Sequence, residues 1–71
     1  MKFLDKPLIT NREKEVFELL LQDKTSKEIA NKLFISEFTV RVHISNVIKK
    51  LGVKERSHAV IKLIKLGELQ L

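Results

Sequence analysis

The sequence predicts a small all-α protein, and three observations lead to that class. Apolar residues recur at helical spacing along most of the chain, and Thr10, Thr25 and Ser36 stand as N-cap residues before three of these runs. Gly52 and Gly67 each follow a periodic run, where glycine commonly ends a helix. A chain of 71 residues is long enough for one domain, so we expect a single domain over 1–71.

The first helix is expected over about 11–22, after a lead-in at 1–7 that we expect to be flexible. Thr10 and Glu13 have the spacing of a capping box, in which the threonine hydroxyl and the glutamate each satisfy a backbone N–H. The apolar positions of this helix are Val16, Phe17, Leu19 and Leu20. Glu13, Glu15 and Glu18 are expected on its exposed face.

A second helix is expected over about 26–33, after a break at 22–24. Thr25 and Glu28 repeat the capping-box spacing. Its apolar residues, Ile29, Ala30 and Leu33, fall on one side and are expected to face the core.

The third run, residues 36–51, admits two interpretations. Residues 40–45 alternate apolar and polar side chains, which is typical of a half-buried strand. A helix capped by Ser36 explains all sixteen residues and places its apolar series in one arc of roughly 100°. That series is Val40, Ile44, Val47, Ile48 and Leu51, and it ends at the residue before Gly52. We therefore predict a helix.

The opposite face of this third helix has an unusual composition. It carries Arg41, Ser45, Asn46 and Lys49 together with the apolar Phe38 and Val42. Such a mixture suits the major groove of DNA, where arginine donates to guanine, serine bonds either way and an apolar group meets the thymine methyl. The alternative is that Phe38 and Val42 pack on a neighbouring helix or on a second subunit.

The last helix is expected over about 55–66. Its apolar residues cover roughly 220° of the helical wheel, about twice what one core-facing stripe needs, and leave His58, Lys62 and Lys65 for water. A second copy of the chain would bury the excess, so we expect a homodimer through this helix. The alternative is that the tail, residues 68–71, folds back over it.

The short second helix, a tight turn and the longer third helix form a helix-turn-helix pattern over about 26–51, with Ala30 and Val40 at the crossing. With this pattern in place, the chain resembles the LuxR-type (GerE-like) DNA-binding domain family over about residues 8–67. The matching segments are LITNREKEVFELL, KEIANKLFIS, FTVRVHISNVIKKLGV and RSHAV. Because it shows no other domain, the chain is similar to the free-standing members of that family, which regulate genes in spore-forming bacteria.

The resemblance implies a four-helix domain, dimerised through its last helix, with the third helix in the major groove. It implies base contacts by Arg41, Val42 and Ser45. It implies contacts to the DNA backbone by Thr25, Lys27, Ser36, Thr39, His43, Asn46 and Lys49. The residues expected at the dimer interface are Val60, Ile61, Leu63 and Ile64.

The chain departs from the family pattern at a few positions. Asp23 stands where relatives usually have glycine before the second helix, so that turn needs another solution. Arg41 and Ser45 stand where some relatives have lysine, so the preferred bases do not transfer from those relatives. Phe38 is bulky for a position that faces a groove.

Composition narrows the function classes. The chain has a formal net charge of +5 and no cysteine, and its excess positive charge lies in residues 37–71, a distribution often found in proteins that bind nucleic acid. His43 and His58 lack the spacing of a metal site, and Glu13, Glu15 and Glu18 have no nucleophile nearby, so we expect neither a metal, a cofactor nor an enzyme. No run approaches the roughly 18 apolar residues of a membrane span.

The sequence thus predicts a cytoplasmic, nucleoid-associated transcription regulator that binds double-stranded DNA as a homodimer and controls sporulation-stage genes. RNA polymerase is a candidate further partner, and neither a membrane nor a small-molecule ligand is expected. The competing hypothesis is a protein-interaction module whose basic charge is incidental.

Overall fold

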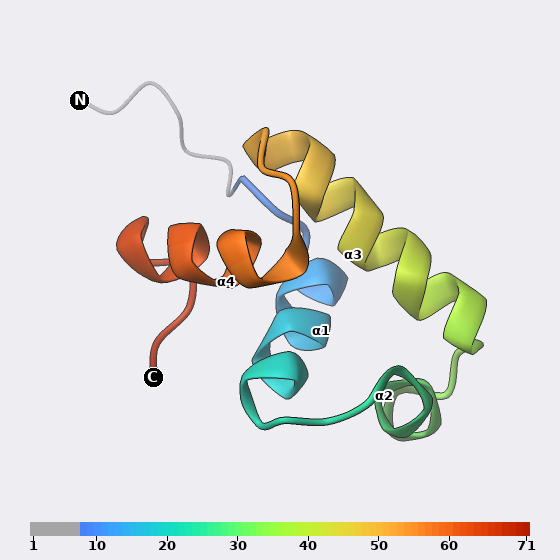
Figure 1. Cartoon of the computed structure of the whole chain (residues 1–71). Helices are drawn as coiled ribbons and strands as arrows, with labels where there is room; N and C mark the ends of the chain where they lie inside the picture. The colour runs from blue at the N-terminus through green and yellow to red at the C-terminus, as the bar shows by residue number, and fades with distance from the viewer. Residues whose placement is uncertain (1–7) are drawn as a thin grey trace.

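Four helices make up the part of the chain that the structure, a computed structural model, describes, which is residues 8–71 (Figure 1). They are α1 (Asn11–Leu21), α2 (Ser26–Leu33), α3 (Glu37–Leu51) and α4 (Arg56–Lys65). The helix predicted over 36–51 is confirmed, and the strand interpretation of residues 40–45 is excluded. The expected flexible lead-in, residues 1–7, lies outside the described residues.

Both predicted capping boxes are present. At the start of α1, the Thr10 N–H donates to Glu13 Oε1 over 2.9 Å and the Glu13 N–H donates to Thr10 Oγ1 over 3.1 Å. At the start of α2, the matching Thr25 and Glu28 distances are 2.8 and 3.1 Å. Each box satisfies two backbone donors that a helix start would otherwise leave unpaired, so the sequence fixes these starts locally.

The two turns before α2 and α3 use left-handed residues other than glycine. Asp23 adopts φ +64°, so an aspartate supplies the conformation that glycine usually supplies there. Phe34 adopts φ +59° at the end of α2, and the next N–H, that of Ile35, donates to the Ala30 carbonyl over 3.0 Å. A bulky residue at positive φ is an uncommon and costly choice. These two turns set the helix-turn-helix geometry.

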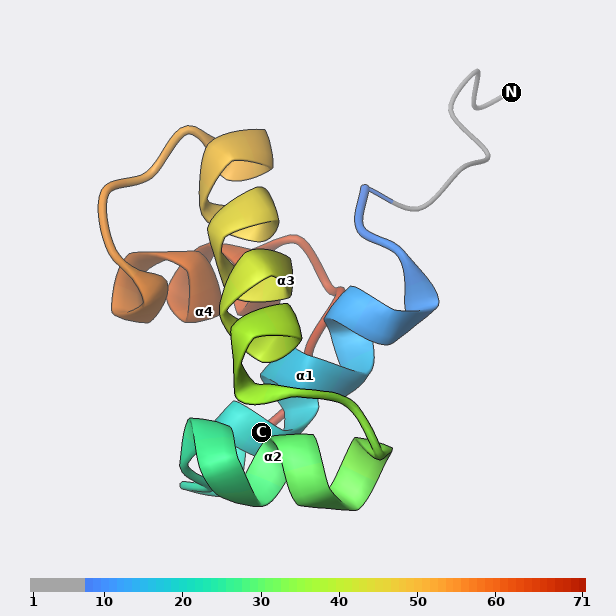
Figure 2. The same ribbon diagram turned by 90° about the vertical axis from the view of Figure 1, so that its right-hand side faces the viewer.

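The core forms around α3, which packs against all three other helices (Figure 2). Its buried residues, Val40, Ile44, Val47 and Leu51, are four of the five predicted, and Ile48 is partly buried beside them. The other buried apolar residues are Ile9, Val16, Phe17, Leu19, Ile29, Ala30, Ala59, Leu63 and Leu69. One face of α3 is thus buried in the core along the length of the helix.

Glu13 was expected on an exposed face, and this expectation is wrong. Its side chain is only 3% exposed, and Lys50 of α3 places its Nζ 2.7 Å from Glu13 Oε1. Burial raises the pKa of this carboxyl, but hydrogen bonds from the Lys50 ammonium and the Thr10 N–H outweigh burial, and the net pKa lies below the usual value. The capping glutamate therefore also ties α1 to α3.

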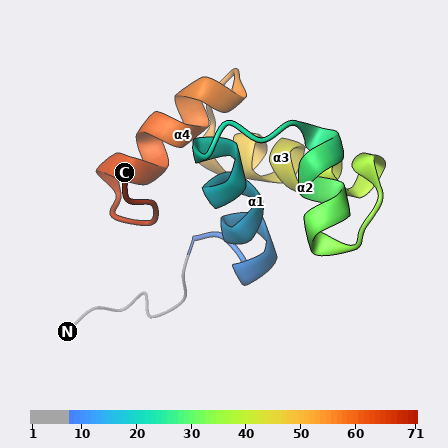
Figure 3. The same ribbon diagram turned by 90° about the horizontal axis from the view of Figure 1, so that it is seen from below.

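The tail turns back at the end of α4, and Gln70 and Leu71 lie beside Glu18 of α1 (Figure 3). The N–H groups of Glu68 and Leu69 both donate to the Leu63 carbonyl, and the Leu69 side chain joins the core. Leu63, expected at the dimer interface, is itself fully buried in the core of the chain. The tail nevertheless leaves Ile61 53% exposed, so apolar surface remains on α4.

Lys62 is exposed, as expected, and it also has a structural role. Its Nζ donates to the carbonyl of Leu51, the last residue of α3, over 3.1 Å. A cation at the C-terminus of a helix pairs with the unsatisfied carbonyls and with the negative end of the helix dipole. Lys62 therefore stabilises the end of α3 and its connection to α4.

Candidate nucleic-acid interface

The outer face of α3 carries the three residues expected to contact bases. Arg41, Val42 and Ser45 are all exposed, while Val40 and Ile44, their neighbours in the sequence, are buried. At about 100° per residue, the three exposed side chains point away from the arc that α3 buries. The core holds one face of the helix, and so it fixes the direction in which the other face points.

Arg41 is held in place only lightly. Its guanidinium lies 3.6 Å from the Glu37 carboxylate, one turn earlier on α3, and both side chains are about half exposed. A solvent-exposed pair at this spacing contributes about 0.3–0.5 kcal/mol, whereas a bidentate arginine–guanine contact discriminates by about 1–3 kcal/mol. Glu37 can therefore orient Arg41 before binding without keeping it from a base.

Hydroxyl groups line the start of α3. Ser36 Oγ accepts the Thr39 N–H over 3.0 Å and donates its own proton to Thr39 Oγ1 over 3.0 Å. The Ser36 hydroxyl is thus used by the cap, and the Thr39 hydroxyl keeps its proton for an external acceptor. Of these two expected phosphate contacts, Thr39 has the freer donor.

The start of α2 presents a second set of donors. Thr25 Oγ1 accepts the Glu28 N–H, and the Thr25 hydroxyl and the Lys27 side chain are both exposed. The Glu28 carboxylate occupies the Thr25 N–H, and this hydrogen bond, more than any other contact, keeps the pKa of Glu28 below its usual value. An anion at this helix start would therefore meet the Thr25 hydroxyl and Lys27 rather than that N–H.

The remaining expected backbone contacts differ in exposure. Asn46 and Lys49 are exposed on α3, whereas His43 is partly buried. The Nδ1 atom of His43 is buried and has no hydrogen-bond partner among the described residues. Nδ1 is therefore turned away from any external group, and a hydrogen bond from this ring to DNA would be made through Nε2.

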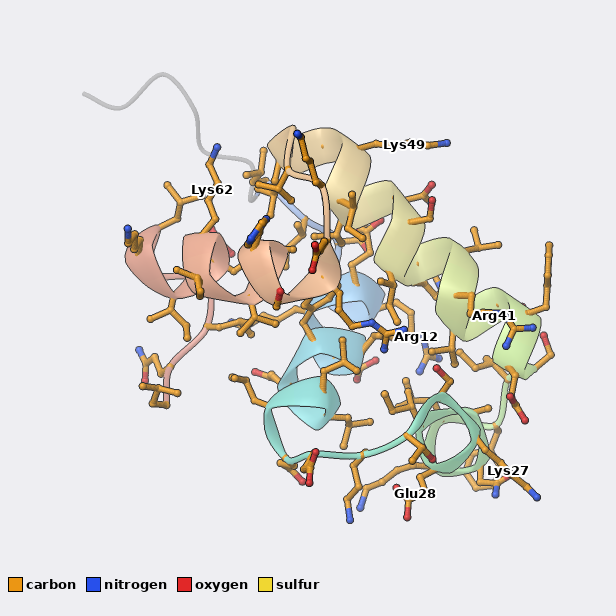
Figure 4. The ribbon with its side chains drawn as sticks, viewed as in Figure 1. Arg12, Lys27, Glu28, Arg41, Lys49 and Lys62 are labelled. Carbon is orange, nitrogen blue, oxygen red and sulfur yellow. The ribbon has the colours of Figure 1, made fainter. Side chains whose placement is uncertain are left out.

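Three basic side chains of α2 and α3 project on one side of the molecule (Figure 4). Lys27, Arg41 and Lys49 extend away from α4, whereas Lys62 lies on the opposite side. The structure thus brings residues of α2 and α3 that are up to 22 positions apart onto one surface. We call this surface the α3 face, and it comprises Thr25, Lys27, Thr39, Arg41, Val42, Ser45, Asn46 and Lys49.

The fold brings one further basic residue beside this surface. Arg56, the first residue of α4, lies across a shallow groove from Arg41 and Ser45, with Ile44 and Ile48 at its base. Arg56 is exposed and forms no salt bridge with any residue in 8–71. Its position after the α3–α4 connection is set by the fold, and no local pattern in the sequence points to it.

An apolar surface on α4 lies apart from the α3 face. Ile61 and Leu66 are exposed, and Val60 and Ile64 are partly buried. With Leu63 in the core, three of the four residues expected at the dimer interface retain accessible surface. This part of α4 is therefore the surface open to a second subunit.

Neither a metal site nor a membrane segment is found in the described part of the chain. Residues 8–71 contain no group of three or more His, Cys, Asp or Glu side chains that could hold a metal ion. None of the four helices is long and apolar enough to cross a membrane.

Comparisons with known proteins agree with this geometry. The family of bacterial regulatory proteins called the luxR family, or GerE family, matches residues 7–63. The spore germination protein GerE of Bacillus subtilis (strain 168) is 67% identical over 70 residues, which cover 99% of this chain and 95% of that protein. The CsgBAC operon transcriptional regulatory protein of Escherichia coli (strain K12) is 49% identical over 53 residues, but these are only 24% of its length.

Two solved structures show that the similarity holds for the three-dimensional fold as well as for the sequence. The structure of the transcription factor GerE has a TM-score of 0.90 and 54% identity, and the match covers 92% of this chain and 97% of that one. The response regulator ChrA of a heme-sensing two-component system has a TM-score of 0.82 and 32% identity, and the match covers 93% of this chain and 33% of ChrA. The predicted all-α LuxR-type fold is therefore confirmed, and the chain belongs to the luxR family of bacterial transcription regulators.

Proposed function

We propose that this regulator binds double-stranded DNA sequence-specifically as a homodimer, with α3 of each subunit in the major groove. The observation that carries this proposal is the division of α3 into a buried face and an exposed face that bears Arg41, Val42 and Ser45. The likeness to GerE, named as a spore germination protein, supports control of sporulation-stage genes in the cytoplasm. RNA polymerase is a candidate further partner.

In this proposal, contacts between α3 side chains and base edges determine which DNA sequence is bound. Arg41 leaves its weak pair with Glu37 and donates two hydrogen bonds to guanine N7 and O6. Val42 contacts a thymine methyl, and the Ser45 hydroxyl bonds to a base edge as donor or acceptor. The desolvated arginine–guanine contact is worth more than the exposed arginine–glutamate pair, so the exchange is favourable.

Phosphate contacts supply affinity and register. Thr39 donates through its free hydroxyl proton, Thr25 donates through its exposed hydroxyl, His43 donates through Nε2–H, and Lys27 and Lys49 contribute charge. Ser36, at the N-cap of α3, and Asn46, on its exposed face, complete the set, and we add Arg56 on the flank. These contacts hold the helix in the groove but carry no sequence information themselves.

Dimerisation through α4 would place two copies of α3 on neighbouring half-sites. A symmetric dimer of this kind reads a palindrome whose half-sites lie about one helical turn, or 10–10.5 base pairs, apart. Ile61, with Val60 and Ile64, would bury its exposed apolar surface against the partner. The charged residues of the α3 face remain free for DNA.

Gel shifts on a selected site and on random DNA, across a salt series, test the proposal. Arg41→Ala should weaken binding to the preferred site by about 1–3 kcal/mol and relax selection at one base. Lys49→Ala should weaken binding to all sequences alike and reduce the salt slope by about 0.9 per subunit. An equal loss on specific and random DNA for Arg41→Ala would contradict its role, and the absence of salt-sensitive, sequence-dependent binding would favour a protein-interaction module.

A further inference from the structure

Two apolar side chains lie on the exposed face of α3, in the first two turns of the helix. Phe38 is 68% exposed and Val42 is 38% exposed, and they are the two exposed large apolar residues of this helix. An exposed phenylalanine still gains if its ring is removed from water, so Phe38 is available to an apolar group of a ligand that meets this face. Both residues lie among polar side chains rather than in an extended apolar patch.

Helical geometry aims these two side chains in the same direction as the base-contacting residues. At about 100° per residue, Phe38 lies within roughly 40° of Val42 and roughly 20° of Ser45 on the wheel. Lys49 is also within roughly 20° of Phe38. A groove that receives Val42 and Ser45 therefore also receives Phe38.

The major groove offers one strongly apolar group, the C5-methyl of thymine. Phe38 and Val42 are four residues apart, which is about 6 Å along a helix axis. Bases on one DNA strand rise by about 3.4 Å each, so the two side chains span about two base steps. We propose that Phe38 is a specificity residue that contacts a thymine methyl, about two base steps from a second thymine contacted by Val42.

Charge on the surrounding surface favours DNA over a protein as the occupant. Arg41 and Lys49 flank the apolar pair on α3, and Lys27 projects on the same side from α2 (Figure 4). A cationic rim around an apolar centre complements a duplex, in which phosphates border the groove that carries the methyl groups. This inference rests on the proposed function, because it assumes that α3 enters the major groove.

The test replaces each thymine of a selected duplex by deoxyuridine, one position at a time, which removes only the methyl group. Dissociation constants are measured by fluorescence anisotropy for the full chain and for Phe38→Ala, Val42→Ala and Phe34→Ala. Phe34→Ala is the matched control, because Phe34 is 94% exposed but lies in the turn before α3. Circular dichroism confirms that each variant is folded.

We expect one thymine whose replacement weakens wild-type binding about fourfold, the affinity equivalent of one buried methyl group. That penalty should disappear in Phe38→Ala, and a second penalty about two base steps away should disappear in Val42→Ala. Both penalties should persist in Phe34→Ala. Equal penalties in the wild type and in Phe38→Ala, or no penalty in the wild type, would overturn the inference while sequence-specific binding stands. A wild type without salt-sensitive, sequence-dependent binding would overturn the proposed function as well.

Discussion

The buried pair between Glu13 and Lys50 provides a sharp prediction, because the chain contains its own control. Glu13 and Glu28 occupy the same position in two capping boxes, with hydrogen-bond distances that agree within 0.1 Å. Glu13 is buried and bound to Lys50, whereas Glu28 is exposed. Substitution of either by glutamine removes one negative charge and keeps a side chain that can cap the helix.

The expected magnitude follows from the contacts. A hydrogen bond to a charged group is worth about 1.5–3 kcal/mol, and partial exposure of Lys50 to solvent reduces this, so we expect Glu13→Gln to cost about 1–2 kcal/mol. A domain of this size is stable by only about 4–10 kcal/mol, and each kcal/mol shifts Tm by about 4–8 °C. Tm should therefore fall by roughly 5–15 °C for Glu13→Gln. Glu28→Gln should shift it by a small fraction of that.

Thermal and urea unfolding, followed by circular dichroism at neutral pH, measure both variants. Lys50→Met adds a second check, because it should be at least as damaging as Glu13→Gln, since it leaves the buried carboxylate without its cation. Equal destabilisation by Glu13→Gln and Glu28→Gln would refute the reasoning. It would mean that both glutamates act only as caps and that the contact between α1 and α3 contributes nothing.

Three further predictions concern other features of the fold. The lowered pKa of Glu13 means that its stabilising effect is complete above its ordinary value of 4.5 and is lost as pH falls through the lower folded value. As pH falls from 4.5 through the lower folded value, wild-type Tm should therefore fall more steeply than that of Glu13→Gln, and parallel curves in this range would contradict this. Ile61→Glu should leave the helical spectrum unchanged and convert a dimer to a monomer in analytical ultracentrifugation, so a variant that stays dimeric would exclude α4 as the interface. Phe34→Gly should raise stability by about 0.5–1 kcal/mol, because glycine relieves the left-handed strain and little packing is lost, and a lower Tm would show that Phe34 is needed in the turn.

Much of the fold could be predicted from the sequence because its signals are local. Thr10, Thr25 and Ser36 each bond to a group three residues away, so the helix starts can be read from short windows. Helical periodicity predicts which residues of α3 form the buried arc, and the residues outside that arc form the exposed face. For the same reason, the base-contact candidates Arg41, Val42 and Ser45 could be chosen without coordinates.

The features that were missed depend on distant contacts. The partner of Glu13 is 37 residues away, and Lys62 bonds to a carbonyl eleven residues earlier. Neither contact is part of the helical spacing from which the elements were predicted. Leu63 could not be separated from its apolar neighbours on α4, because the wheel does not show which of them the tail and the core bury. Arg56 reaches the side of the α3 face only through the path of the α3–α4 connection.

The central claim, that α3 enters the major groove, has a direct chemical test. In a selected duplex, the guanines are replaced one at a time by 7-deazaguanine, which removes a major-groove acceptor, or by inosine, which removes the minor-groove amino group. We predict that 7-deazaguanine at one guanine of each half-site weakens wild-type binding strongly and leaves the residual binding of Arg41→Ala unchanged, while inosine has little effect. Binding that is sensitive to inosine but not to 7-deazaguanine would place the protein in the minor groove and contradict the proposed mode of recognition.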